Sequence, residues 1–450
     1  MELKIFRDQL FTQGKEYGFT DMELYYEKSN SLKCGVFESE VDEYESATVN
    51  GISLRGLYDG KMGYAYTENM EEDSIPYLLE NAKENAVLME SDPEELFAGS
   101  DSYKKQDLYT DALDDVQPET FITFLKRLEE KINSFDPRVR HTEMTMLQRQ
   151  SIEKGLYNNK GLALSERNNF LVVVASVSVE EDGELKSGMQ FKVGKDFSVF
   201  DVDELAKETV EKALKALGGK AYPNKNYPVI LENNAAATFL ATFVSSFSAE
   251  AVQKEQSRLK GKLGEQIASQ IVTLTDDPFL PEGIKSSTFD AEGVPTSKRT
   301  IIENGKLMTY FHNQQTAKKD GVSSTGHGSR SSYKDSLEVS PSNFFVEPGE
   351  ASYKSLYSGL KEGIIITNLA GMHSGANPIS GDFSLAADGF YVKDGKIVGP
   401  TKLMTVAGNF FDVMKDVAEV GDDLAFSPMT FSGYIGSPSL KIKQLSIAVD

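Results

Sequence analysis

Few residues in this sequence have the chemistry that a hydrolytic metal site requires. Zinc enzymes hold the metal with histidine, cysteine or carboxylate side chains, and metallopeptidases often present two histidines on one helix. The chain of 450 residues has one cysteine and four histidines, which are His141, His312, His327 and His373. The histidines stand at least 15 residues apart, so no neighbouring pair can start such a site. A metal centre rich in histidine and cysteine is therefore not expected.

Two short motifs resemble catalytic or nucleotide-binding patterns only in part. His141-Thr-Glu143 matches the His-x-Glu of zinc deaminases, but the Pro-Cys-x-x-Cys that completes that site is absent. Two polar residues on one face of a strand explain this motif better. Gly326-His327-Gly328-Ser329 fits neither the Walker nor the Rossmann spacing, so a loop is favoured there over a nucleotide site.

The sequence gives equally little support for a catalytic nucleophile. Ser374 follows Gly371-Met-His373 and is not the centre of a Gly-x-Ser-x-Gly nucleophile elbow. Cys34 lies in an apolar stretch, where a cysteine is more typically a small buried apolar residue than a reactive thiolate. A metal-free hydrolase that uses Ser374 or another nucleophile is kept as a third alternative, and a peptidase assay with and without a chelator would test it.

Composition excludes several classes of protein. The formal charge is −22, which disfavours contact with nucleic acid, and a single cysteine excludes a disulfide scaffold. The charged start Met-Glu-Leu-Lys-Ile-Phe-Arg-Asp does not resemble a secretory signal, so a cytoplasmic protein is expected. The uncharged stretch 233–249 has 17 residues and several polar ones, which favours a buried helix over a membrane span.

The elements that must position these residues follow two patterns. Helical spacing of apolar residues alternates with strand-like runs, and the order helix, strands, helix occurs twice before residue 220. The expected helices are 3–17, 73–89, 119–135 and 202–217, and the expected strand regions are 22–68 and 138–199. Tight hairpin turns are expected at Asn50-Gly51, Asp59-Gly60, Asn159-Lys160-Gly161 and Asp182-Gly183. These patterns predict a duplicated region of helices and antiparallel sheet.

The second half differs in character. A Gly-Gly and a Pro mark a boundary near residues 218–223, and a long helix from Asn233 is expected to present Phe239, Leu240, Phe243, Val244 and Phe247 on one face. Glycine turns then separate short apolar runs, which is typical of strands. We therefore predict an α+β protein with domains at 1–105, 110–220 and 225–450, the last of them mixed and rich in strands.

Several motifs in this last domain resemble one known family. In order along the chain they are Ala249–Lys254, Gly261–Ser269, Thr275–Pro278, Asp290–Thr296, Ala376–Ser384, Val406–Asn409 and Gly436–Leu440. This series resembles the PmbA (TldE) branch of the TldD/PmbA peptidase family, whose members also carry the label of modulator of DNA gyrase. The resemblance covers most of residues 227–450, and it is less specific in the first half.

The resemblance implies a cytoplasmic metallopeptidase system in which TldD-type and TldE-type subunits pair. The TldD type resembles a zinc enzyme with His-Glu-x-x-x-His and a late cysteine. At the matching positions this chain has Ala249, Glu250 and Lys254, and Thr430 falls near the position of the cysteine. The three ligand positions have lost their donors. The resemblance therefore implies no metal in this chain and zinc on a TldD-type partner.

The same resemblance implies a groove for an unfolded peptide, which strands can bind through backbone hydrogen bonds. His373, Asn377 and Asp382 are candidates for polar residues of the groove, although turn formation at Asn377-Pro378 and Gly381-Asp382 explains two of them equally well. For Glu250, an ordinary helix carboxylate facing solvent or Lys254 at i+4 is favoured over a catalytic role.

These observations lead to two main hypotheses. The first is a cytoplasmic TldE-type subunit that binds unfolded peptides for a metallopeptidase complex, paired with a TldD-type subunit or with itself. The alternative is a non-catalytic, homodimeric peptide-binding or scaffolding protein. In both, any effect on DNA gyrase is expected to be indirect, without direct binding to nucleic acid, because direct contact needs a basic surface.

Overall fold

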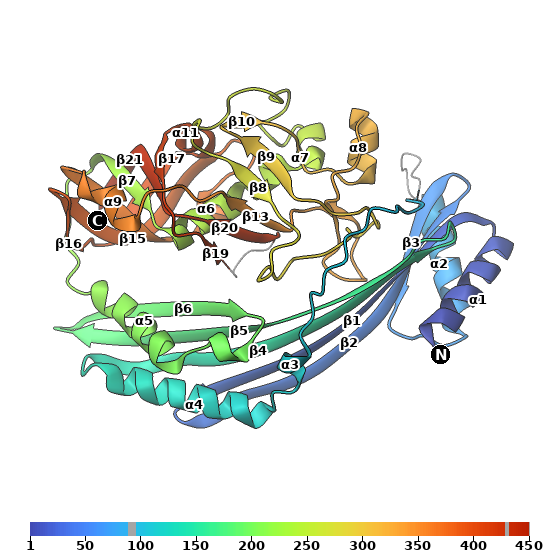
Figure 1. Ribbon diagram of the computed structural model, residues 1–450, viewed down its shortest axis with the longest axis horizontal. Coiled ribbons are helices and arrows are strands. Elements are labelled where there is room, and N and C mark those ends of the chain that lie inside the picture. The colour runs from blue at the N-terminus through green and yellow to red at the C-terminus, as the bar shows by residue number, and fades with distance from the viewer. Residues whose placement is uncertain (89–95, 428–431, 450) are drawn as a thin grey trace.

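The amino-terminal half forms one long, curved antiparallel sheet. The computed structural model describes residues 1–88, 96–427 and 432–449. One unit of the sheet comprises α1 (Leu3–Glu16), β1 (Phe19–Phe37), β2 (Glu40–Tyr58), β3 (Lys61–Thr67) and α2 (Ser74–Leu88). The other comprises α4 (Pro118–Phe135), β4 (Val139–Asn158), β5 (Ala163–Glu181), β6 (Glu184–Gly194), η1 (Phe197–Val199) and α5 (Val202–Lys215). The strand order β3-β2-β1-β4-β5-β6 joins the two units through β1 and β4 (Figure 1).

Each unit buries the apolar side of its own helix pair. In α4 the buried residues Phe121, Leu125, Leu128 and Ile132 recur at spacings of three and four, and Pro118 occupies the first turn. Asp201 caps α5 by accepting a hydrogen bond from the backbone N–H of Glu204. The predicted duplication of helices and antiparallel sheet is confirmed, because local apolar periodicity specifies these elements.

One predicted turn is wrong. Asp59-Gly60 and Asp182-Gly183 have the positive φ angles of tight hairpins, as expected. Asn50-Gly51, however, lies inside β2, and the chain turns instead at Glu38-Ser39. Gly51 serves close packing, since a Cβ there would lie 2.3 Å from the ring of Tyr333, which belongs to the carboxy-terminal half.

A crossing segment without regular structure joins the two units. Residues 96–110 run along the molecule to the short helix α3 (Asp111–Asp114), and Figure 1 shows this path between the sheet and the rest of the chain. Among the described helices, none combines the length and the apolar character that crossing a membrane requires.

The carboxy-terminal half contains a closed sheet, a second sheet and a two-stranded ribbon. The closed sheet comprises β7 (Lys225–Leu231), β14 (Glu362–Ala370), β15 (Asp382–Lys393), β16 (Lys396–Pro400), β17 (Met404–Asn409), β18 (Val417–Val420) and β21 (Leu440–Val449). The pairing of β14 with both β7 and β15 closes it. The second sheet has the order β10-β9-β8-β13-β20-β19. Its strands are β8 (Leu274–Asp276), β9 (Arg299–Glu303), β10 (Lys306–Leu307), β13 (Asn343–Val346), β19 (Ala425–Ser427) and β20 (Tyr434–Ser437).

The ribbon and the helices complete this half. The ribbon pairs β11 (Gly328–Ser329) with β12 (Glu338–Val339) in antiparallel orientation. The helical elements are α6 (Asn233–Phe243), η2 (Val244–Phe247), α7 (Ala249–Gln253), α8 (Gln314–Asp320), α9 (Tyr353–Ser358), α10 (Met372–Gly375) and α11 (Phe410–Lys415). The predicted mixed, strand-rich architecture is confirmed.

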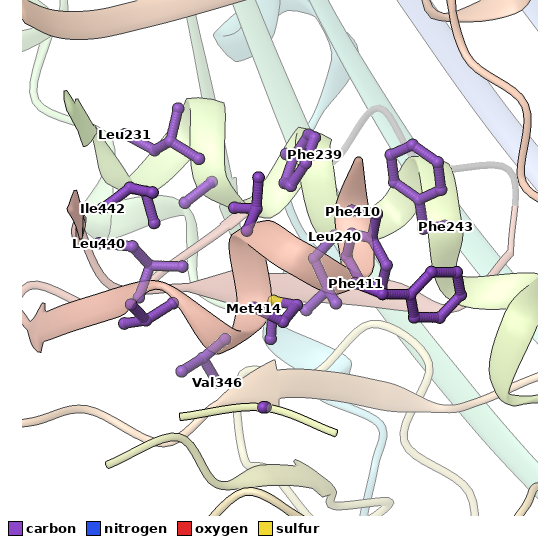
Figure 2. Close-up of a cluster of buried hydrophobic side chains, with 14 of the residues drawn as sticks. Leu231, Phe239, Leu240, Phe243, Val346, Phe410, Phe411, Met414, Leu440 and Ile442 are labelled. Atoms are coloured by element: carbon purple, nitrogen blue, oxygen red, sulfur yellow. The ribbon is translucent and has the colours of Figure 1, made fainter. Parts of the chain in front are cut away.

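An aromatic core holds α6 against the closed sheet. Phe243 stacks on Phe410 with 4.6 Å between ring centroids, and Phe239 meets Phe383 edge to face at 5.0 Å. Figure 2 shows Phe239, Phe243 and Phe410 together with the aliphatic residues that surround them. These rings fix the direction in which the chain leaves α6.

The long helix expected from Asn233 is broken into three pieces. The α-helix ends at Phe243, a 3₁₀ turn follows over Val244–Phe247, and α7 begins after Ser248. The five apolar residues named for this helix are all buried, as expected. The helix breaks because Ser248 is extended and its hydroxyl accepts the N–H of Glu250, which is the chemistry of a new helix start.

Candidate functional site

The short helix α7 carries the positions at which the TldD-type motif would place its metal ligands. Ala249 is fully buried, and its backbone N–H donates to the carbonyl of Phe311 at 2.9 Å. Helix α7 ends at Gln253, and Glu255 turns the chain away with a φ of 60°. The helix is therefore held at both ends by backbone contacts, and its exposed side carries Glu250 and Lys254.

Glu250 and Lys254 form an ion pair. The Nζ of Lys254 lies 2.6 Å from Oε1 of Glu250, and the two side chains are 60% and 40% exposed respectively. The i,i+4 pair expected from the sequence is thus present. An exposed pair of this kind contributes only about 0.3–0.5 kcal/mol to stability. Its importance lies in placing an ammonium group directly against the carboxylate.

A groove of about 360 Å³ runs beside this ion pair. One wall is formed by η2, α7 and Gln256, and the other by the segment that contains β12. The described residues that line it are Val244, Ser245, Ser248, Glu250, Ala251, Lys254, Gln256, Phe311, Ser336, Leu337, Glu338, Val339, Pro341 and Ser432. Four of these residues are serines, whose hydroxyls can form hydrogen bonds with a chain that lies in the groove.

The wall that contains β12 presents backbone groups away from its ribbon partner. The backbone N–H of Ser340 donates to the carbonyl of His327, which lies on the β11 side. In an antiparallel ladder, successive residues alternate between pointing their N–H and C=O toward the partner strand and away from it. Val339 therefore directs its backbone groups away from β11, and it lines the groove together with Leu337. This edge can add a further strand.

The donors needed for zinc do not fit at this site. Alanine offers no ligand, and the ammonium of Lys254 repels a cation. Of the positions carried over from the family motif, only Glu250 retains a group able to bind a metal. Among the described residues, no cluster of three or more His, Cys, Asp or Glu side chains is suited to a metal ion. Thr430 lies outside the described residues.

The three polar residues expected in a peptide groove lie in the segment from α10 to the start of β15. Asn377 accepts hydrogen bonds from the backbone N–H groups of Ile379 and Ser380, which is a turn geometry. Asp382 accepts from the amide of Asn409 at 2.8 Å, and this bond lowers the pKa of its carboxyl. His373 is exposed in α10. None of the three is among the described residues that line the groove.

The turn that contains Asn377 nevertheless adjoins the groove wall. The hydroxyl of Ser246 in η2 donates to the carbonyl of Pro378 at 2.9 Å. On the other side of the turn, Nη1 of Arg258 donates to the carbonyl of Ser380 at 3.1 Å. This turn therefore contacts η2 through the carbonyl of Pro378.

A buried charge cluster, defined here as Glu23, Arg55, Asp290, Glu292 and Arg330, lies between the amino-terminal sheet and the carboxy-terminal half. Arg330 donates to Glu23 at 2.6 Å, and Arg55 approaches the same carboxylate at 3.1 Å. A nitrogen of Arg55 also lies 3.9 Å from Glu292. All five residues are buried or nearly so. Buried charges persist only when they are paired in this way.

Two carboxyl groups of the cluster, those of Asp290 and Glu292, have raised pKa values. Burial raises the pKa of Asp290, although the N–H groups of Glu292, Gly328 and Val294 oppose the shift. Burial also raises the pKa of Glu292, and the neighbouring Asp290 adds to this effect, while Arg55 opposes it. Strongly shifted carboxyl groups are found at functional sites and in structural ion-pair networks alike.

Neither the β12 wall nor the cluster follows from sequence reasoning. Residues 336–339 are ordinary loop residues in the sequence and lie about 90 positions from α7. For the cluster a signal did exist, because Glu23 and Arg55 are charged residues within apolar strand runs, and charge in such a run requires a partner. The identity of that partner depends on the tertiary fold.

Other motifs have structural roles. Glu143 accepts hydrogen bonds from Ser176 and Ser187 on β5 and β6, and His141 contacts Ser178. Cys34 is buried in the core under α4. His327 is buried and pairs with Asp276 at 3.1 Å, beside the start of β11. The contacts of His141 and Glu143 agree with the prediction of two polar residues on one face of a strand. The burial of Cys34 agrees with the prediction of a small buried apolar residue.

Comparisons with known proteins agree with this geometry. Residues 224–449 match the model described as PmbA/TldA metallopeptidase C-terminal domain. Residues 22–86 and 111–217 match the models of domain 1 and of the central domain of the same metallopeptidases. The three matches follow one another in order and together span most of the chain.

Individual relatives cover nearly the whole length. The Metalloprotease PmbA of Escherichia coli O157:H7 is 24% identical, over 93% of this chain and 91% of the relative. A crystal structure of a proposed modulator of a DNA gyrase from Thermotoga maritima has 30% identity and a TM-score of 0.92, and covers 99% of this chain and 100% of that one. TldE from Thermococcus kodakarensis shares the fold at 24% identity, with a TM-score of 0.90 and coverage of 98% and 100%.

The resemblance stated from the sequence motifs is confirmed by these matches. The domain models, the named relatives and the solved folds agree with one another. The chain therefore belongs to the PmbA/TldD metallopeptidase family.

Proposed function

We propose that this chain is a TldE-type subunit of a cytoplasmic metallopeptidase complex, in which it binds unfolded peptides while a TldD-type partner holds the zinc. The observation that carries the proposal is the groove between α7 and β12, whose α7 wall has lost the ligand positions and whose β12 wall presents a strand edge. The division of the chain into domains 1–105, 110–220 and 225–450 belongs to the same proposal.

The groove suits backbone recognition of a peptide. A strand added to β12 would pair with the backbone groups of Leu337 and Val339, which carry no sequence preference of their own. The serine hydroxyls along the lining can bond to further backbone groups of the peptide. Such a site accepts varied sequences but requires an extended chain, which is the chemistry of an unfolded substrate.

The ion pair at α7 supports the proposal that this chain binds peptide while the partner subunit holds the zinc. A metallopeptidase glutamate accepts a proton from zinc-bound water. Here the carboxylate of Glu250 is paired with Lys254 at 2.6 Å, on a helix whose two histidine positions hold Ala249 and Lys254. The site therefore has a groove beside α7 but lacks the donor set for a metal. Peptide binding without metal chemistry is the function that remains for this chain alone.

The proposed groove predicts a specific effect of Val339→Pro. Proline removes the N–H that points away from β11 and leaves the ribbon bonds of Glu338 and Ser340 in place. We expect binding of fluorescein-labelled casein peptides to weaken about tenfold or more, because strand addition needs that donor. Fluorescence anisotropy measures the change. Val339→Ala is the matched control and should bind like the wild type; equal binding by Val339→Pro would contradict the proposal.

The nature of the partner needs a separate experiment. We expect the native protein to co-purify from cell extract with a chain that bears the His-Glu-x-x-x-His motif, and zinc to be found with that chain only. Metal analysis of each chain alone and of the pair measures this. Stoichiometric zinc together with peptidase activity in the isolated chain would overturn the proposal. Recovery of a homodimer without a proteolytic partner would favour the alternative, a peptide-binding or scaffolding protein.

A further inference from the structure

The β12 wall of the groove is part of a hairpin whose loop reaches the amino-terminal sheet. We define the wall hairpin as residues 328–339, which contain β11, a connecting loop and β12. Its strands share only two paired positions, Gly328 with Val339 and Ser329 with Glu338. A two-stranded ribbon of this length is not stable by itself in water. The position of β12 therefore depends on what holds the loop and the base of the hairpin.

Arg330 fastens the loop to the sheet. Its Nη2 donates to Oε1 of Glu23 on β1 at 2.6 Å, and its Nη1 donates to the hydroxyl of Ser53 on β2 at 3.2 Å. The guanidinium also lies 4.9 Å from the ring centroid of Tyr25. The Arg330 and Glu23 side chains are 1% and 0% exposed, so water screens this pair very little.

Tyr333 forms a second contact three residues further on. Its ring covers Gly51 in β2, where a Cβ would lie 2.3 Å from the ring. Its hydroxyl donates to Glu68 at 2.8 Å, and its carbonyl accepts a hydrogen bond from the hydroxyl of Tyr64 on β3. The loop thus contacts β1, β2 and β3 before the chain returns to the groove.

The base of the hairpin is held by the other side of the same charge cluster. Asp290 accepts the backbone N–H of Gly328 at 2.9 Å, and the carbonyl of Gly328 accepts the N–H of Ala291. Glu292, two residues after Asp290, lies against Arg55, which shares Glu23 with Arg330. A continuous set of buried contacts therefore joins the sheet to both ends of β11.

We propose that Arg330 is a positioning residue for the groove: by holding the wall hairpin to Glu23, it keeps the β12 edge in the place where a peptide strand can be added. The amino-terminal sheet thereby sets the affinity of a groove built entirely from the carboxy-terminal half. The part of this inference that concerns affinity rests on the proposed peptide-binding function, whereas the part that concerns the hairpin does not.

Arg330→Met tests the inference without leaving a buried charge unpaired. Methionine keeps an unbranched apolar side chain of similar length, and Glu23 retains Arg55 as its partner at 3.1 Å. We expect the backbone amides of residues 336–340 to exchange about tenfold faster in hydrogen-exchange mass spectrometry, because the hairpin opens locally. We also expect the labelled casein peptides to bind about tenfold more weakly. Arg330→Lys, which keeps the charge, should recover much of both properties.

Lys154→Met is the matched control. Lys154 on β4 pairs with Glu166 at 2.9 Å, donates to Ser287 at 2.9 Å and lies over the ring of Phe289, so it also joins the sheet to the carboxy-terminal half through residues outside the wall hairpin. It should leave exchange over 336–340 and peptide binding unchanged. If Arg330→Met does not fold, Arg330→Lys carries the test, and a partial loss of both properties is then expected.

Hydrogen exchange tests the positioning role of Arg330, and peptide affinity tests the proposed peptide-binding function as well. Unchanged exchange over 336–340 in a folded Arg330 variant would overturn the inference, as would faster exchange with unaltered peptide affinity. Equal effects of Lys154→Met would also overturn it, because they would indicate general loosening between the two halves. If the hairpin loosens as expected but the wild type binds no peptide, the positioning role of Arg330 stands and only the proposed function fails.

Discussion

Phe243→Ala is expected to lower the free energy of unfolding by about 3–5 kcal/mol, the range measured for fully buried Phe-to-Ala substitutions. The side chain is 0% exposed and stacks on Phe410 with 4.6 Å between ring centroids, so its removal leaves a cavity that rigid neighbours cannot fill. Chemical denaturation of the full chain measures the loss. Phe135→Ala is the matched control, because Phe135 is 42% exposed and should cost less than about 1 kcal/mol.

The same substitution has a functional consequence. Phe243 ends α6, and the next residues, Val244 and Ser245, line the groove. We expect Phe243→Ala to weaken peptide binding as well, because η2 loses the contact that fixes its direction. Equal losses of stability in Phe243→Ala and Phe135→Ala would contradict the view that this aromatic cluster anchors the groove wall.

Glu292→Gln is expected to make the protein less sensitive to alkaline pH. Burial and the nearby Asp290 raise the pKa of Glu292 from 4.5 to about 8, against the opposing charge of Arg55. The folded chain therefore holds a proton that the unfolded chain releases, and stability falls as the pH rises from about 4.5 to about 8. Each pKa unit corresponds to ~1.4 kcal/mol, so Glu292→Gln should gain about 3 kcal/mol on wild type between about pH 6 and about pH 9.

Denaturation curves of both proteins over this pH range measure the effect. The carboxyl of Asp290 is also raised in pKa and interacts with Glu292, so the difference between the two proteins reports the titration of this carboxyl pair. Glu16→Gln, at an exposed position of α1, should run parallel to the wild type at every pH. A constant difference between Glu292→Gln and wild type across the range would show that Glu292 is ionised throughout.

The buried charge cluster that contains Glu292 also holds the wall hairpin of the groove. Its members hold both the base and the loop of the wall hairpin, through Asp290 and Arg330 respectively. We therefore expect ionisation of a buried carboxyl in this cluster to act on the segment that carries β12. This gives the buried charges a role in positioning, which a solvent-exposed network could not provide because water would screen it.

Much of the fold could be predicted from local pattern. Helix 119–135 was expected and the structure has Pro118–Phe135, because four apolar residues at helical spacing leave no competing arrangement. Asp59-Gly60 is a tight hairpin as expected, since both residues adopt positive φ. Asn50-Gly51 is also a dipeptide that favours tight turns, but it lies within β2. What differs is Tyr333, almost 300 residues away, whose ring requires a glycine beneath it.

Of the two walls of the candidate groove, only the α7 wall could be predicted from the sequence. The family motif located α7 and the pair of Glu250 and Lys254, because these residues are neighbours in the sequence. The opposite wall, residues 336–339, consists of Ser, Leu, Glu and Val with no recognisable motif. Asn377 and Asp382 belong to a motif that resembles the family, and the structure gives Asn377 a turn geometry, while the adjacent Pro378 contacts Ser246 of η2.

By itself the sequence determined the family and most of the helices and strands, and it showed Ala249 and Lys254 at the positions where the resemblance implies histidines. These properties are local: they depend on residue chemistry and on periodicities of two to four residues. Only the tertiary structure decided that β12 faces α7 and that Arg330 meets Glu23, although 307 positions separate the last two. A buried charge signals that it needs a partner, but the packing of the whole chain determines which partner it finds.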